Sequence, residues 1–149
     1  MEYQTKDTIE MKGNLTVTVF DEQGNVKDQR AIKNLVVSAG KTFIASRMVG
    51  TSQAIMSHMA IGTGTTTPAV AQTTLTTEAG RVTLASSSSS SNAVTYTATF
   101  PAGTGTGAIT EAGIFNAASA GTLLCRTTFP VVNKAAGDSI AVTWVVTVS

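Results

Sequence analysis

Few residues of this 149-residue chain could carry out acid–base or nucleophilic chemistry. His58 is the only histidine and Cys125 the only cysteine. Nucleophilic catalysis needs a proton acceptor beside a Ser, Cys or Thr, and no Asp or Glu lies within several residues of His58. One histidine and one cysteine also cannot form a zinc cluster. We therefore expect no enzymatic activity, no catalytic residue, no metal and no cofactor, with a structural His58 and a buried Cys125 thiol.

One segment has part of the pattern of a phosphate-binding loop. Gly40-Lys41-Thr42 follows an apolar run and precedes a predicted helix. Such a loop needs a second glycine five positions earlier, and that position is Leu35. We interpret the segment as the first turn of the helix.

Two glutamates are the candidates for the paired carboxylates of a glycoside hydrolase. They are Glu78, three residues before Arg81, and Glu111, two residues before Gly113. Each is better explained as the partner of an arginine or as a cap at the end of a strand than as a general acid or base.

The overall charge limits the partners that the chain can bind. Charged residues make up 13% of the sequence and the formal net charge is +1, whereas soluble proteins average roughly 25% charged residues. Such a composition offers no basic surface for a phosphate backbone. No segment is apolar enough to span a bilayer. Neither nucleic acid nor a membrane is an expected partner.

Alternation of apolar and polar residues dominates the sequence and predicts β-strands. It is clearest in Gly13 to Phe20, Ala93 to Phe100 and Ile140 to Val148, and Val26 to Val37 forms a predicted hairpin with the first of these. Many short strands separated by turn residues are typical of an antiparallel β-sandwich or a barrel-like meander. The predicted fold class is therefore all-β.

Breaks in this alternation predict the helix and the loops. A single short helix is expected near residues 39–49, with Ser38 as its cap and Gly50 as its stop. The Gly- and Thr-rich segment Gly62 to Pro68 is a predicted loop, and so is Ala102 to Gly107. The serine run Ser86 to Ser91 buries nothing and predicts an exposed hairpin connection.

Four groups of residues resemble a set of small structural proteins of tailed phages. These groups are Asn34 to Met48; His58 to Thr65 with Pro68, Leu75, Glu78 and Arg81; Ile109 to Phe115; and Leu123 to Arg126 with Trp144. Proteins with this pattern occur as capsid cement or decoration proteins and as modules of tail fibres or baseplates. The resemblance implies a virion protein that is assembled in the host cytoplasm.

Three functions follow from this resemblance and from the composition. The first is a capsid cement protein, a homotrimer or homodimer that binds the major capsid protein on the outer capsid surface and stabilises contacts between its subunits. The alternative is a structural module of a tail fibre, collar or baseplate. A carbohydrate-binding module is the second alternative, although most of the few aromatic residues fall on apolar strand faces and are expected in the core.

The domain organisation is predicted from the polarity of the N-terminus. Residues 1–12 are expected to form an arm and residues 13–149 a single β-sandwich domain. The sizeable apolar residues of the arm are Tyr3, Ile9 and Met11, which we expect to contact a neighbouring subunit. The competing interpretation makes this segment a strand of the domain itself, extending the hairpin that starts at Gly13.

Overall fold

The computed structural model describes residues 7–50 and 53–149, and it contains nine strands and one helix within these ranges. The strands are β1 (Met11–Phe20), β2 (Val26–Val36), β3 (His58–Gly62), β4 (Glu78–Thr83), β5 (Ser86–Ser90), β6 (Ala93–Phe100), β7 (Gly107–Phe115), β8 (Leu123–Lys134) and β9 (Ser139–Val148). Helix α1 (Ser38–Arg47) lies between β2 and β3.

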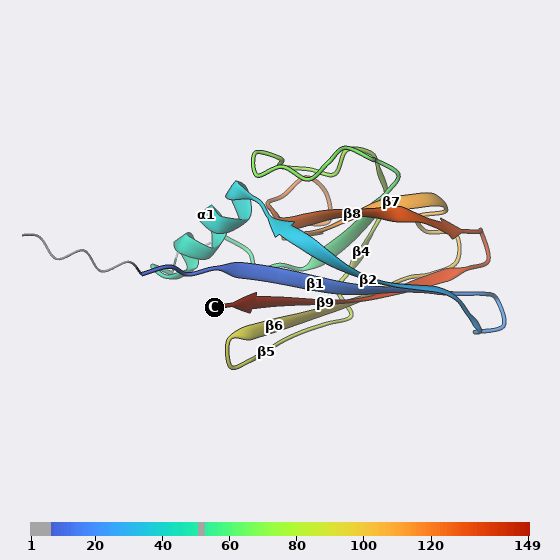
Figure 1. Cartoon of the computed structure of the whole chain (residues 1–149), viewed down its shortest axis with the longest axis horizontal. Helices are drawn as coiled ribbons and strands as arrows, with labels where there is room; N and C mark the ends of the chain where they lie inside the picture. The colour runs from blue at the N-terminus through green and yellow to red at the C-terminus, as the bar shows by residue number, and fades with distance from the viewer. Residues whose placement is uncertain (1–6, 51–52) are drawn as a thin grey trace, which may run out of the picture.

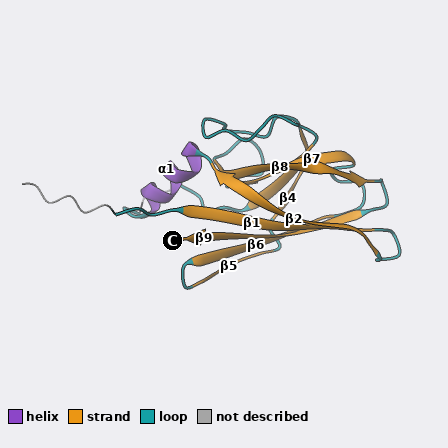
Figure 2. Ribbon diagram, in the orientation of Figure 1, coloured by secondary structure: helices purple, strands orange, loops and turns teal. Residues whose placement is uncertain are grey.

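All neighbouring strands are antiparallel, in the order β4-β3-β7-β8-β2-β1-β9-β6-β5. The sheet curls into a half-barrel with two layers, which Figures 1 and 2 show one above the other. We call the layer of β2, β1, β9, β6 and β5 sheet A and the layer of β4, β3, β7 and β8 sheet B. Only Leu35 and Val36 of β2 pair with β8 and so join the two layers. The predicted all-β antiparallel class, with one short helix, is confirmed.

The hydrophobic core lies between the two layers because the alternating strands point their apolar residues inward. Trp144 of β9 is fully buried and pairs across the sheet with Leu15 of β1 and Tyr96 of β6. Ile114 and Cys125 of sheet B face the same core. Burial raises the pKa of the Cys125 thiol, which leaves it protonated and unreactive at neutral pH.

The start of β1 lies inside the segment that we expected to be an arm. Met11 pairs with Val148 of β9, and Glu10 exchanges two backbone hydrogen bonds with Ser149, of 2.7 and 2.8 Å. Residues 10–12 are therefore held by the sheet, while residues 7–9 precede it and are exposed.

Two local predictions were wrong. The serine run is a strand, β5, rather than a connection, because its backbone pairs with β6 although all five side chains stay exposed. Ser38 does not cap the helix: Val37 occupies the cap position, and no side chain caps α1. The predicted loop at Gly62 to Pro68 and the strand at Ala93 to Phe100 lie where the sequence placed them.

Candidate functional site

The outer face of sheet B is covered by the loop between β3 and β4, residues 63–77, which we call the covering loop. This loop crosses above β7 and β8 in Figure 1. Apolar residues between the loop and the sheet form a second, smaller core of Val37, Ala60, Leu75, Phe115 and Leu123. Leu75 is the residue that the loop contributes to this core.

A buried glutamate on β7 holds the covering loop from below. Glu111 is fully buried. Its Oε1 accepts hydrogen bonds from the backbone amides of Gly64, at 3.0 Å, and Thr77, at 2.7 Å, and its Oε2 accepts one from Thr76, at 2.9 Å. One carboxylate thus satisfies three backbone donors at the two ends of the loop.

The same glutamate pairs with a buried arginine on the adjacent strand. Arg126 of β8 donates from Nε and Nη2 to Oε2 of Glu111, at 3.1 and 2.7 Å. Its Nη1 donates to the carbonyl of Thr66 and to Oε1 of Gln72, and its Nη2 also donates to the hydroxyl of Thr76. Both side chains of the ion pair are 0% exposed. We call this pair, with its bonds to the loop, the Glu111–Arg126 clasp.

Two glycines make room for the clasp. A Cβ atom at Gly62 would lie 2.6 Å from Oε1 of Glu111, and one at Gly64 would lie 2.5 Å from the same oxygen. Both distances are shorter than van der Waals contact, so only glycine fits at these positions. This explains the Gly62-Thr63-Gly64 pattern, which the sequence alone showed only as a loop.

The electrostatics of the clasp favour its charged form. Burial by itself raises the pKa of Glu111, but the backbone amides of Thr77, Thr76 and Gly64 and the guanidinium of Arg126 outweigh it, so the pKa lies below its ordinary value. The carboxylate has no free face toward solvent and its oxygens already accept five hydrogen bonds. The clasp is therefore a structural element rather than an acid–base centre.

Glu78, the other candidate carboxylate, also serves a structural pair. It contacts Arg81 at 2.7 Å, as the sequence predicted. Arg81 in turn donates to the carbonyls of Ala117 and Ala120 and lies 3.7 Å from the ring centroid of Phe115.

Within the described residues, the ring nitrogens of His58 have only hydroxyl groups as hydrogen-bond partners. Its Nδ1 lies 2.8 Å from the hydroxyl of Ser57, and its Nε2 lies 3.4 Å from that of Thr83. Among the residues that the structure describes, no three His, Cys, Asp or Glu side chains gather in a group that could hold a metal ion. No helix in this part of the chain is long and apolar enough to cross a membrane.

The outer face of sheet A carries hydroxyl groups on β1, β9, β6 and β5. Thr16 of β1, Thr143 of β9, Thr97 of β6 and Ser86 of β5 are aligned in one row across four strands. Further rows place Thr95 beside Ser88, and Thr99 beside Ala141. No charged residue occurs in β5, β6 or β9. We call the outer surface of these three strands, together with Thr16 of β1, the hydroxyl face; Lys12 of β1 and Lys33 of β2 lie on the same side of sheet A beyond it.

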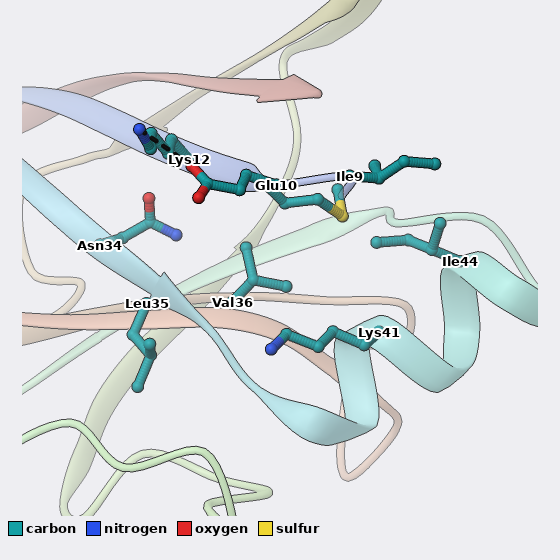
Figure 3. A pocket seen from close by; sticks show the side chains of 9 residues that line it. Ile9, Glu10, Lys12, Asn34, Leu35, Val36, Lys41 and Ile44 are labelled. Carbon is teal, nitrogen blue, oxygen red and sulfur yellow. Dashed lines mark ion pairs between the residues drawn. The ribbon is translucent and has the colours of Figure 1, made fainter. Parts of the chain in front are cut away.

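A groove of about 460 Å³ lies at the end of the molecule that carries α1 and both ends of the described chain (Figures 1 and 3). Figure 3 shows Ile44 and Lys41 of α1 on one side, with Ile9 and Glu10 on the other. The groove exists because β2 leaves β1 after Asn34 to join β8, which separates the two layers. Apolar residues of β1, β2 and α1 line it together with Asn34 and charges of both signs, including an ion pair between Glu10 and Lys12 of 3.1 Å.

Two of the three predicted interface residues line this groove. Ile9 is 78% exposed, and Met11 packs partly against the core and also borders an adjacent apolar groove of about 240 Å³. Tyr3 lies outside the described residues. The structure thus brings Ile9 and Met11 together with Ile44, which no sequence pattern had connected to them.

A comparison with protein families identifies the group to which the chain belongs. The model for the N-terminal region of phage tail-collar fibre proteins matches residues 29–148. The chain belongs to this family. It is therefore a phage virion structural protein, which confirms that prediction at this level. Capsid cement, its location on the outer capsid surface and its expected partner, the major capsid protein, gain no support from the match. No curated protein and no solved structure matches the chain.

Proposed function

We propose that the chain is a structural module of the phage tail, part of a tail fibre or of the collar, and that it works by binding its neighbours rather than by catalysis. The observation that carries this proposal is the family match, which spans α1 and eight of the nine strands in full or in large part. It favours the tail-fibre and collar alternative over capsid cement.

Two surfaces suit such binding. The hydroxyl face offers a broad uncharged area for shallow contacts, which gain strength when many copies bind together. The groove beside α1 offers the apolar side chains of Ile9, Met11 and Ile44, with charged groups around them, to a neighbouring virion protein. Large apolar residues are exposed near β1 and at the end of α1: Ile9 is 78% exposed, Met48 84% and Val49 82%. Exposed apolar side chains of this size mark contact sites when they cluster.

The location of the chain in the virion is the first test. Phage particles that carry an epitope tag on this chain should bind gold-labelled antibody at the tail, and quantitative mass spectrometry should find only a few copies per particle. Label over the whole head, with copies numbering in the hundreds, would instead identify a capsid cement protein.

The second test asks whether the groove is the attachment surface. Ile9→Asp places a charge at the rim of the groove without disturbing the core, so the protein should fold normally but be lost from purified particles. Val26→Asp is the matched control, because Val26 is 60% exposed and starts β2 at the opposite end of the molecule. Normal incorporation of the Ile9→Asp chain would exclude the groove as the attachment site.

A further inference from the structure

We propose that β5 is a self-association edge, at which two copies of this chain pair their β5 strands antiparallel about a two-fold axis. The sheet order ends at β5, which pairs only with β6 in the described part of the chain. Alternate residues of an edge strand point their backbone N–H and C=O groups away from the sheet, where another strand can bind them.

β5 also lacks the stabilisation that a strand on its own needs. All five of its side chains are exposed, so it contributes nothing to the core, and serine has no strong preference for strands. Backbone pairing with β6 is its main attachment. A second strand on the open side would satisfy the remaining backbone groups and fix the geometry of β5.

The opposite edge of the sheet shows how this protein protects a strand that stays unpaired. β4 carries the Glu78–Arg81 ion pair, and Arg81 binds the carbonyls of the 116–121 turn. A Cβ at Gly80 would lie 2.8 Å from the backbone nitrogen of Gly105, so a second loop lies against this strand. Charges and covering loops are the usual protection of an edge strand. β5 has neither in the described structure, nor a proline.

The sequence around β5 fits a second copy of the same chain as the partner. Antiparallel pairing about a two-fold axis brings residues close to the axis beside their own counterparts, so a charge there would face an identical charge. No Asp, Glu, Lys, Arg or His occurs between Arg81 and Glu111. A run of identical serines is also complementary to itself in an antiparallel arrangement, whichever serine lies on the axis. Beside the edge, Ile55 is 61% exposed next to two shallow hollows that Ser87 also lines, and a second copy would cover it.

The test uses the full chain and introduces a charge at Ser88, the middle residue of β5. Sedimentation over a concentration series should give the mass of two copies for the wild type. Ser88→Lys should weaken this association by about tenfold or more, because Ser88 is the middle residue of β5 and the two lysines would lie close together near the axis. Ser88→Glu should do the same, and an equimolar mixture of the two variants should recover the two-copy mass. Unchanged melting temperatures would show that both variants fold.

Thr74→Lys is the matched control. It adds the same charge at an exposed position of the covering loop, on the outer face of sheet B and not on the edge strand β5, and should keep the two-copy mass. The proposal is overturned if the wild type has the mass of one chain throughout the series, if Ser88→Lys associates as the wild type does, or if mixing the two variants restores nothing.

Discussion

The two layers of this protein use their outer faces in opposite ways. Sheet B is covered by a loop that a buried ion pair holds in place, with both charges 0% exposed. Sheet A presents rows of threonine and serine, with no charged residue in β5, β6 or β9. Although the chain has few charged residues, Glu111 and Arg126 are both used to hold the covering loop against sheet B. The comparison suggests that sheet B provides a rigid support, whereas sheet A is available for contacts between molecules.

The largest effect is expected from breaking the clasp. Glu111→Ala leaves the buried guanidinium of Arg126 without its counter-charge and three backbone amides without their acceptor, which should lower the free energy of unfolding by about 3–5 kcal/mol. Denaturant unfolding measures this change. Glu10→Ala is the control, because the Glu10–Lys12 pair is 57% and 72% exposed at its two side chains, and an exposed pair contributes less than about 1 kcal/mol. Equal losses in the two variants would contradict the assigned role of the clasp.

Acid should weaken the clasp in a defined direction. The folded-state pKa of Glu111 lies below its ordinary value of 4.5. Its contribution to stability is therefore complete above that ordinary value and is lost as the pH falls toward the folded-state pKa. Asp28 and Asp138 also have lowered pKa values, so the wild type alone does not isolate the effect.

The difference between the wild type and Glu111→Gln isolates the clasp in this measurement. We expect the wild type to lose its advantage in the free energy of unfolding as the pH falls below about 4.5. If the difference in the free energy of unfolding between the two proteins stayed constant down to the lowest pH at which both fold, the carboxylate charge would not be what holds the covering loop.

A charge on the hydroxyl face should affect contacts but hardly affect folding. Thr143 is exposed at the centre of sheet A, so Thr143→Lys should change the free energy of unfolding by less than about 0.5 kcal/mol. If this face contacts neighbouring virion proteins, the variant should nevertheless be depleted from assembled particles. Thr65→Lys, in the covering loop of sheet B, is the control. If Thr143→Lys and Thr65→Lys entered phage particles equally well, the outer face of sheet A would not be a preferred contact surface.

The smallest effect is expected from shortening the serine run. Deleting Ser87 and Ser88 removes two exposed residues and keeps the alternation of the strand, since side chains repeat every two residues. The isolated domain should lose only a few tenths of a kcal/mol, measured by thermal unfolding at low concentration. A large loss would show that β5 supports the core of sheet A, contrary to its full exposure.

The sequence by itself determined the fold class, the helix and most strands, because alternation and turn residues are local signals. The Ala93 to Phe100 strand and the Gly62 to Pro68 loop are examples, and so is the inward-facing Trp144. The pairing of Glu78 with Arg81 was also predictable, since the two residues are three apart in the chain.

Only the tertiary structure decided the features that depend on strand register. Glu111 and Arg126 are diagonal neighbours only because β7 and β8 pair with Gly113 facing Arg126 and Glu111 facing Thr128. The row from Thr16 to Ser86 needs β1, β9 and the β5–β6 hairpin, which are distant from one another in sequence. The serine run is a strand for a different reason: its backbone hydrogen bonds to the neighbouring strand β6 require no side-chain burial, so its composition carried no signal of them. Residue patterns specify which face of a strand is apolar, whereas hydrogen bonding between distant strands specifies which residues meet.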